Sequence, residues 1–369
     1  MNIAHQRLLN QHIALPTFQR PGDVVRWLGA VQAQDYAAAK WAIAQRTKGI
    51  TDSAVDQAFD KGEFLRTHVM RPTWHFVAPE DIRWLLELTA PRVHAANAYQ
   101  YRRLELDKAI FKRRNAALTK ALRDGQQLTR TELASVLQQA GIEANDLLRL
   151  TYLILSAELD GILCSGARRG KQFTYALLDE RVPAAKTLSR TEALAELTRR
   201  YFTGHGPASE EDFVWWSGMT RADVRSGIEM AKPQLGHDVI NGQTYWFAAS
   251  MTTAKVSPQA AYLLSNYDEY IIGYTDRSAI FDSSHVDKLD ARSNPLFQHT
   301  LVINGQVAGT WKRTLKKDAV IIELNPFTPL TKSEKQTISA AAKKYREFLE
   351  LPIAFLSKVG GSATRNDIY

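Results

Sequence analysis

Two glutamines near the N-terminus, Gln32 and Gln34, are the first side chains in this sequence that suggest chemistry. They lie in the stretch Val31-Gln32-Ala33-Gln34-Asp35, directly after residues 23–30, whose pattern predicts an amphipathic helix. An amide does not act as a base near neutral pH, but it donates and accepts hydrogen bonds. Two amides buried in a cleft could therefore hold a water molecule or a sugar without ionising. The alternative is that both glutamines cap the helix end, and the spacing alone favours capping.

The charge of the chain favours a polyanionic partner. Its 369 residues include 47 basic and 39 acidic side chains, giving a net charge of +8, and the pI is about 9.4. Among polyanions, such a surplus favours nucleic acid. The basic clusters are Arg102-Arg103, Lys112-Arg113-Arg114, Arg168-Arg169 with Lys171, and Lys312-Arg313 with Lys316-Lys317. Each alone is more often a solvated face, but at hairpin ends they could hold DNA phosphates and position a duplex without reading its sequence.

The sequence excludes several common kinds of site. It has no Gly-rich phosphate loop, no His-Glu-x-x-His and no Gly-x-Ser-x-Gly element. Its nine histidines lack metal-ligand spacing, so we expect neither a metal nor another cofactor. Cys164 is the only cysteine, which excludes a disulfide scaffold and fits a reducing cytosol.

Length and hydropathy set the expected organisation. No stretch approaches the roughly 20 apolar residues of a membrane span, and residues 1–7 have no signal-peptide pattern. We therefore expect a cytoplasmic, nucleoid-associated chain with no membrane partner, acting as a monomer. The length predicts roughly two to four domains.

Residues 1–80 show helical patterns followed by strand patterns. We expect helices over residues 3–14, 23–30, 37–45 and 51–59, the last capped by Thr51. Residues 64–77 alternate apolar with basic or polar side chains, which predicts two short strands in a hairpin. We expect one polar face of this hairpin to carry Arg66, His68, Arg71 and His75. Helices followed by a basic hairpin are the parts of a winged helix, a relative of the helix-turn-helix.

The same order recurs in residues 81–185 and 186–254. In the second stretch, helices are expected over residues 81–88, 99–122, 128–137 and 147–159, before a basic loop that joins two strands at Arg168, Arg169 and Lys171. In the third, helices over residues 191–202, 209–216 and 221–230 precede a hairpin over 239–247 with an Asn-Gly turn. Sequence identity between the stretches is negligible, so we infer structural repetition only. The expectation is three tandem winged-helix motifs.

Residues 255–369 predict a β-rich domain with a terminal helix. Strand character is expected over residues 262–277, 301–311 and 319–324, and an amphipathic helix over 333–349. The segment Tyr267-Asp268-Glu269-Tyr270 is unusual, and Asp268 could either form a turn or salt bridge or face a cleft. The expected fold class is α+β.

Five ordered motifs spread over nearly the whole chain carry a family resemblance. They are Val31-Gln32-Ala33-Gln34, Arg71-Pro72-Thr73-Trp74-His75-Phe76-Val77, Asp212-Phe213-Val214-Trp215-Trp216-Ser217-Gly218, Leu264-Ser265-Asn266-Tyr267-Asp268-Glu269-Tyr270 with Gly273-Tyr274-Thr275-Asp276-Arg277, and Gly309-Thr310-Trp311-Lys312-Arg313. Together they resemble the winged-helix DNA glycosylase family of AlkZ and AlkX (YcaQ). The resemblance implies tandem winged helices in a C-shape around a DNA channel, with a β-rich C-terminal domain. It also implies removal of alkylated bases, including cross-linked purines in some members.

The resemblance further implies where the active site lies. The family motif is Gln-aliphatic-Gln in the AlkZ-like branch and Gln-aliphatic-Asp in the AlkX branch. Gln32-Ala33-Gln34 is similar to the first, although Ala33 is small for the aliphatic position. Asp35 follows immediately, and its role is open.

A mechanism follows from the chemistry of the lesion. N7-alkylation places a positive charge on a purine, so the base departs without protonation and needs no general acid of raised pKa. The enzyme then has to stabilise an oxocarbenium-like sugar and place a water molecule, which we expect Gln32 and Gln34 to do in a monofunctional glycosylase. Double-stranded DNA is expected to be held by Arg66, Arg71, His75, Arg168, Arg169, Lys171, Lys312 and Arg313, and the possible cleft residues are Trp74, Tyr267 and Asp268. The second hypothesis is a non-catalytic winged-helix DNA-binding protein, either a regulator or a damage binder.

Overall fold

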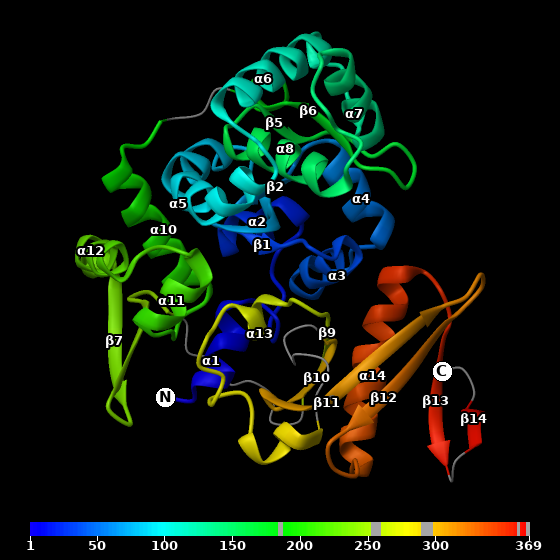
Figure 1. Ribbon diagram of the computed structural model, residues 1–369. Coiled ribbons are helices and arrows are strands. Elements are labelled where there is room, and N and C mark those ends of the chain that lie inside the picture. Colours follow the sequence, from blue (N-terminus) through cyan, green and yellow to red (C-terminus); the bar gives the residue numbers. More distant parts are fainter. Residues whose placement is uncertain (184–186, 252–259, 289–297, 360–361, 367–369) are drawn as a thin grey trace.

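Helices and short hairpins alternate along the chain before a larger sheet forms near its C-terminus (Figure 1). The computed structural model describes residues 1–183, 187–251, 260–288, 298–359 and 362–366. The expected mixture of helix and strand is therefore present, with helices dominating the first part of the chain.

The first unit has the predicted order of helices and strands. Its elements are α1 (Ile3–Asn10), α2 (Pro21–Leu28), β1 (Val31–Gln32), α3 (Tyr36–Arg46), α4 (Asp52–Asp60), β2 (Leu65–Val69) and β3 (Arg71–Val77). Thr51 caps α4 as predicted, since its side chain accepts a hydrogen bond from the Ala54 amide at 3.2 Å. Helix α2 ends two residues earlier than predicted because Gly29 adopts a left-handed φ of 78°.

The second unit differs from the prediction in one helix. Its elements are α5 (Ile82–Arg103), α6 (Lys108–Leu122), β4 (Leu128–Thr129), α7 (Arg130–Gln139), α8 (Leu147–Leu159), β5 (Leu163–Ser165), β6 (Thr174–Leu177) and α9 (Leu178–Arg181). The predicted break between residues 88 and 99 is wrong, because α5 continues through Pro91. Ala90 and Val93, on either side of this proline, are buried in an apolar cluster with Leu155 and Leu159 of α8. That packing supports the helix past the proline.

The third unit has the predicted order. It contains α10 (Arg190–Gly204), α11 (Glu210–Ser217), α12 (Arg221–Ala231), a 3₁₀ turn η1 (Lys232–Gln234), β7 (Leu235–Ile240) and β8 (Gln243–Ala248). The Asn-Gly turn between the strands is confirmed, with φ of 51° at Asn241 and 80° at Gly242. Both values lie in the left-handed region that two-residue hairpin turns require.

Strand pairing repeats along with element order. In each of the first two units, a short strand between two helices pairs with the second strand of the following hairpin. Strand β1 pairs with β3, and β4 pairs with β6. In the third unit the equivalent pairing is a single bridge between Ala208 and Trp246. Three segments without noticeable sequence identity therefore share one topology of helices and strands.

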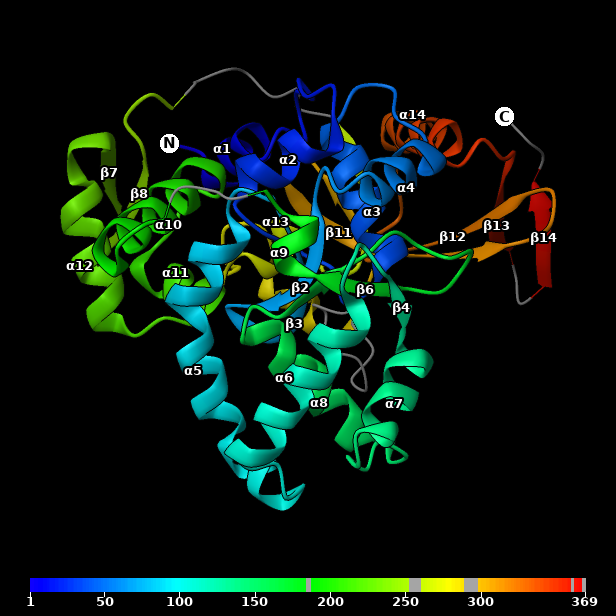
Figure 2. The same cartoon turned by 90° about the horizontal axis from the view of Figure 1, so that it is seen from above.

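The last part of the chain forms a six-stranded sheet. The elements are β9 (Ala261–Leu264), α13 (Glu269–Ile272), the 3₁₀ helix η2 (Ser283–Lys288), β10 (Thr300–Ile303), β11 (Gln306–Leu315), β12 (Val320–Pro326), α14 (Lys332–Leu349), β13 (Ile353–Val359) and β14 (Ser362–Asn366). The strand order is β14-β13-β12-β11-β10-β9, with only β12 and β13 parallel among the described pairs, because α14 connects them. Figure 2 shows β12, β13 and β14 extending to one side of the molecule beyond α14.

One expectation for this region is wrong. Residues 266–277 were expected to continue the strand of β9, but they contain the short helix α13. Asp268 caps it by accepting a hydrogen bond from the Tyr270 amide at 2.9 Å, which turns the chain out of the sheet.

The hydrophobic core runs between the units. One apolar cluster joins β2, β3 and α5 to α10, α11 and α12, and another joins α2, α3 and α4 to β9–β13 and α14. Trp41 of α3 shows the second contact, because its ring lies 4.7 Å from Tyr345 of α14 and its indole N–H donates to the Leu263 carbonyl. The first unit thus packs against both the third unit and the six-stranded sheet. The division at residues 80, 185 and 254 stays a prediction.

Candidate active site

Strand β1 places the stretch that contains the two glutamines. Gln32 lies opposite His75 in the antiparallel pair of β1 with β3, and the Ala33 amide donates to the Trp74 carbonyl at 2.8 Å. The predicted helix end is therefore a strand, and neither glutamine forms a helix cap. Asp35 takes that role, since its carboxylate accepts from the Ala38 amide at 3.0 Å at the start of α3.

The two glutamines have different surroundings. Gln32 is only 8% exposed, and its amide oxygen is buried with no hydrogen-bond partner among the described residues. Gln34 is exposed, and its side chain makes no hydrogen bond within the described parts of the chain. A buried acceptor without a partner is uncommon in folded proteins and is found at sites that bind water or substrate. The stretch therefore has one enclosed amide and one amide open to solvent.

Glu269, the first residue of α13, contacts the backbone of Gln32. Its carboxylate accepts hydrogen bonds from the Gln32 amide at 2.9 Å, from the Trp216 indole at 2.9 Å and from the His205 ring at 3.2 Å. Burial alone would raise the pKa of Glu269, but the bond from His205, together with those from Gln32 and Trp216, lowers it below its usual value. A fully enclosed carboxylate thus stays ionised behind the glutamine stretch.

The predicted cleft residue Asp268 lies elsewhere. It is completely buried and holds Arg46 through two hydrogen bonds of 2.9 and 3.0 Å. The expectation that Asp268 faces a cleft is wrong, whereas the alternative of a salt bridge is confirmed. Tyr267 is half-buried and adopts a left-handed φ of 58°. Burial raises the pKa of Tyr267, and the charge of Asp35 adds to the shift.

Two further residues near Asp35, Asn266 and His299, were not singled out from the sequence. The Asn266 side chain donates to Asp35 at 3.2 Å, and its backbone amide donates to the His299 ring at 2.9 Å. Burial lowers the pKa of His299 to about 4, and the charge of Arg313 adds to the shift. His299 is therefore neutral near pH 7. Residue type and spacing single out neither of them, because their contacts join positions more than 30 residues apart, although Asn266 lies within one of the motifs that carry the resemblance.

The basic residues predicted on the β2–β3 hairpin lie on two faces and are mostly enclosed. Arg66 pairs with Phe76 while His75 pairs with Thr67, so strand alternation separates them. Arg66 is 8% exposed, donates to the Ala33 carbonyl at 3.0 Å and lies between the rings of Trp74 and Phe173, at 4.2 and 4.6 Å. The expectation of one exposed polar face is therefore wrong.

His75 and Arg71 also differ from a simple DNA-contacting surface. Burial lowers the pKa of His75 to about 3, with a smaller contribution from the charge of Arg71, and the side chain is completely enclosed. A neutral, enclosed imidazole cannot pair with a phosphate. The expectation that His75 contacts DNA is therefore wrong. Arg71 is half-buried against Trp215, at 5.8 Å, and two of its guanidinium nitrogens have no partner in the described structure. Arg71 therefore has two buried hydrogen-bond donors that no described residue accepts.

The loop between β5 and β6 divides its basic residues. Arg168 pairs with Asp56 of α4 at 3.1 Å and lies between the rings of Tyr36 and Phe173. It is thus part of the interior packing. Arg169 and Lys171 are exposed, and Arg169 forms a surface ion pair with Glu132 at 2.8 Å. Exposed pairs of this kind are weak and exchange readily for other anions.

The C-terminal basic pair lies on β11. Lys312 is exposed, while Arg313 is half-buried, donates to the Tyr345 hydroxyl and lies 5.9 Å from that ring. The charge of Arg313 acts on His299, which connects this strand with the surroundings of Asp35.

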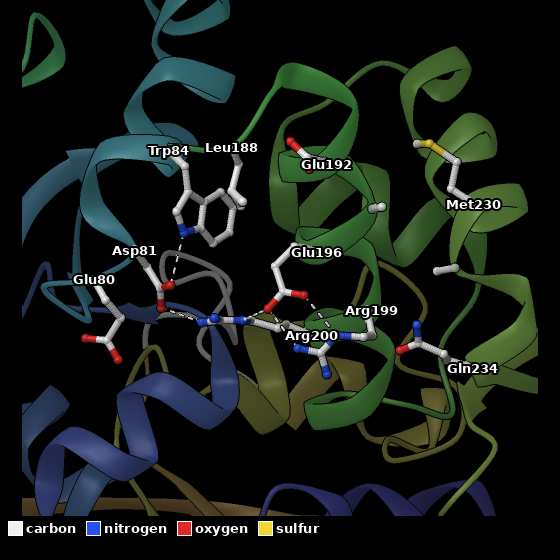
Figure 3. A pocket seen from close by; sticks show the side chains of 12 residues that line it. Glu80, Asp81, Trp84, Leu188, Glu192, Glu196, Arg199, Arg200, Met230 and Gln234 are labelled. Atoms are coloured by element: carbon white, nitrogen blue, oxygen red, sulfur yellow. Dashed lines mark hydrogen bonds and ion pairs between the residues drawn. The ribbon is translucent and has the colours of Figure 1, made fainter. Parts of the chain in front are cut away.

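A separate cavity of about 510 Å³ lies between the start of α5 and helices α10 and α12 (Figure 3). In Figure 3, Arg200 points toward Asp81 and Glu196, with which it forms ion pairs, and Trp84 donates to Asp81 at 3.0 Å. The lining includes none of the predicted site residues. This cavity is therefore separate from the residues selected from the sequence.

The described residues contain no group of three or more His, Cys, Asp or Glu side chains arranged to hold a metal ion. None of the helices in these ranges has the length and apolar character needed to cross a bilayer.

Comparison with known proteins decides the family. The sequence model described as "DNA glycosylase AlkZ-like" matches residues 25–348, which is most of the chain. The chain belongs to the AlkZ-like DNA glycosylase family. A curated relative from Streptomyces sahachiroi, named an interstrand DNA cross-link repair glycosylase, is 22% identical over 355 residues, covering 92% of each chain. The solved structure of Streptomyces sahachiroi DNA glycosylase AlkZ has a TM-score of 0.78 and 20% identity, covering 96% of this chain and 98% of that one.

In this AlkZ-like chain, motifs far apart in sequence meet around one carboxylate. Glu269 contacts Gln32 and Trp216 directly, and its charge acts on Arg71 and His75. These residues come from four of the five motifs that carried the resemblance. Sequence reasoning selected Asp268 and missed its neighbour Glu269, because nothing in the local pattern distinguishes two adjacent carboxylates. The distinction comes from the cap of α13, which turns one side chain toward Arg46 and the other toward β1.

Proposed function

We propose that this chain is a monofunctional DNA glycosylase that hydrolyses the N-glycosidic bond of alkylated purines carrying an N7-type positive charge. The observation that carries the proposal is the buried, unpartnered amide oxygen of Gln32 beside the exposed amide of Gln34. Membership of the AlkZ-like glycosylase family supports the reaction class.

The proposed chemistry needs no proton donor. A cationic purine is already a good leaving group, so the enzyme has to stabilise positive charge that develops on the sugar and to deliver water. The carbonyl ends of fixed amides present negative dipoles to that charge and accept hydrogen bonds from the attacking water. In the proposal, Gln32 supplies the enclosed acceptor and Gln34, from the solvent side, orients the water.

The neighbouring residues support this division of roles. Arg66 donates to the Ala33 carbonyl and so holds the residue between the two glutamines. Asp35 is occupied by the α3 cap and by Asn266, which favours a structural role over that of a base. Trp74 and Tyr267 are half-buried close to the stretch, and we retain them as residues that could border the nucleotide.

We propose further that the three repeated units are tandem winged helices forming a C-shaped channel around duplex DNA. The shared order of helices, short strand and hairpin supports winged helices. The exposed cations Arg169, Lys171 and Lys312, with Arg71 and Arg313, are the proposed phosphate contacts. Such contacts bind DNA without reading its sequence. Because the Streptomyces relative is named for interstrand cross-link repair, we include unhooking of cross-linked purines among the proposed activities.

The test is release of free 7-methylguanine from alkylated duplex DNA under single-turnover conditions. The variants are Gln32→Ala and Gln34→Ala, beside the controls Gln45→Ala, a buried glutamine of α3, and Gln57→Ala, an exposed one of α4. Each active-site substitution should slow release about 100-fold, as loss of one preorganised dipole does elsewhere. The controls should retain the wild-type rate once their stability is taken into account. DNA binding without release from any lesion would instead favour the non-catalytic DNA-binding protein.

A further inference from the structure

We infer that Glu269 is the positioning residue of the active site, holding Gln32 in place through its backbone amide. The inference rests on the proposed function of Gln32 and extends it to a residue 237 positions away. Glu269 is 1% exposed and contacts the backbone amide of Gln32, so its effect would pass through the glutamine stretch.

Strand β1 lies at the edge of its sheet. In the sheet order β1-β3-β2, this two-residue strand has a neighbour on one side only. The Ala33 amide points toward β3, where it donates to Trp74, so the preceding Gln32 amide points away from the sheet. A buried backbone amide on that outer edge needs an acceptor. The Glu269 carboxylate accepts from it at 2.9 Å and thereby takes the place of a missing strand.

The Glu269 carboxylate is held rigidly. One of its oxygens accepts from Gln32, and the other accepts from both His205 and Trp216. The side chain is 1% exposed, and its three donors come from β1, the C-terminal end of α10 and helix α11. A carboxylate held at both oxygens by three elements cannot rotate without losing several buried hydrogen bonds, each of which is costly to leave unmade.

Apart from Glu269, only the pairing with β3 fixes Gln32 among the described residues. The side-chain oxygen of Gln32 has no partner among the described residues, so the side chain does not fix the residue. The register with β3 fixes one edge of Gln32, and Glu269 fixes the other. Because a misplacement of about 1 Å can reduce a rate about 100-fold, the second edge matters for catalysis.

Asp268 provides a matched control. It precedes Glu269, is equally buried and also forms an ion pair, but its partner is Arg46, and among the described residues it makes no hydrogen bond or ion pair with β1. Loss of either carboxylate should destabilise the fold, since each is a buried, hydrogen-bonded charge. Asp268→Asn removes the charge that pairs with Arg46 but keeps a side-chain oxygen for the α13 cap, so only substitution of Glu269 should alter the position of Gln32.

The experiment compares Glu269→Met, which keeps the volume but removes both oxygens, with Glu269→Gln, which keeps one oxygen for the Gln32 amide. Asp268→Asn is the control. Three quantities are measured on the full chain: the single-turnover rate of 7-methylguanine release, the affinity for the alkylated duplex, and hydrogen exchange of the backbone amide of Gln32. A role limited to folding would not separate the rate from the affinity.

We expect Glu269→Met to slow release at least about 10-fold with DNA affinity within about twofold, and to speed exchange at Gln32. Glu269→Gln should restore most of the rate and the slow exchange, and Asp268→Asn should keep the rate within about twofold of wild type. Equal losses in the Met and Gln variants, or a wild-type rate in the Met variant, would overturn the inference. If Glu269→Met does not fold, fast exchange at Gln32 in the wild-type chain would overturn it as well. A wild-type chain that releases no base refutes the proposed function, whereas the exchange comparison still tests this contact.

Discussion

The β2–β3 hairpin and the β5–β6 loop have similar basic sequences but opposite arrangements of charge. In the first, Arg66 is enclosed between aromatic rings and His75 is neutral and buried. In the second, Arg169 and Lys171 are exposed at the loop. The difference follows from what packs on each. The first hairpin lies between the glutamine stretch and the third unit, whereas the end of the second loop faces solvent. A basic hairpin in a sequence therefore predicts a DNA contact only where nothing else covers it.

The comparison can be tested first through stability. Arg66→Ala removes a buried hydrogen bond to the Ala33 carbonyl and two ring contacts, so we expect the free energy of unfolding to fall by roughly 3 kcal/mol. The exposed Arg169→Ala should change it by less than about 0.5 kcal/mol. Urea denaturation measures both. Equal effects in the two variants would remove the distinction between the hairpins.

A second test uses pH. The pKa of His75 is about 3 in the folded chain, below its ordinary value, so between pH 7 and 5 the unfolded state binds a proton that the folded state does not. Stability contributed by the neutral His75 is thus present above its unfolded pKa and is lost as pH falls, by about 2 kcal/mol over this interval. His75→Gln should remove that part of the pH dependence. Exposed His237→Gln should leave it unchanged, and a wild-type slope in His75→Gln would show that His75 is not enclosed.

A third test concerns DNA affinity. If Arg169 and Lys171 contact phosphates, alanine at either position should weaken binding several-fold, or by about 1 kcal/mol. It should also lower the slope of log affinity against log salt concentration by about one. The effect should be the same for alkylated and unmodified duplex, with the release rate at saturating enzyme unchanged. Filter binding across a salt series measures this. Unaltered affinity in the double variant would place the DNA path elsewhere.

The smallest expected effect is the pH dependence of base release. Amides do not ionise, and His75 and His299 have pKa values of about 3 and about 4, so both are neutral from pH 6 to 8. We therefore expect the single-turnover rate for 7-methylguanine to change by less than about twofold across that range. A sigmoid or bell-shaped profile with a midpoint inside it would reveal a titrating acid or base that the account lacks.

Local signals in the sequence predicted much of the secondary structure. The cap at Thr51 and the Asn-Gly turn at Asn241 were both found where expected. These features depend on a few neighbouring residues. The continuation of α5 through Pro91 was missed because it depends on packing against α8.

The site was predicted less completely for the same physical reason. Gln32 and Gln34 were selected from their types and spacing, supported by the family resemblance. Glu269, His205 and Asn266 act through contacts that join distant segments, and a single sequence does not show which segments meet. Alternation along β2 and β3 also separated basic residues that had been assigned to one face, because the register pairs Arg66 with Phe76 and Thr67 with His75.

The central claim is that two uncharged amides at the end of a short strand, one enclosed and one open to solvent, allow a cationic purine to depart. The most direct measurement is the single-turnover rate of 7-methylguanine release by the Gln32→Ala, Gln34→Ala double variant, with duplex affinity determined on the same preparation. The account predicts a rate at least about 100-fold below wild type at nearly unchanged affinity. A double variant that binds and releases base as fast as the wild-type chain would contradict it.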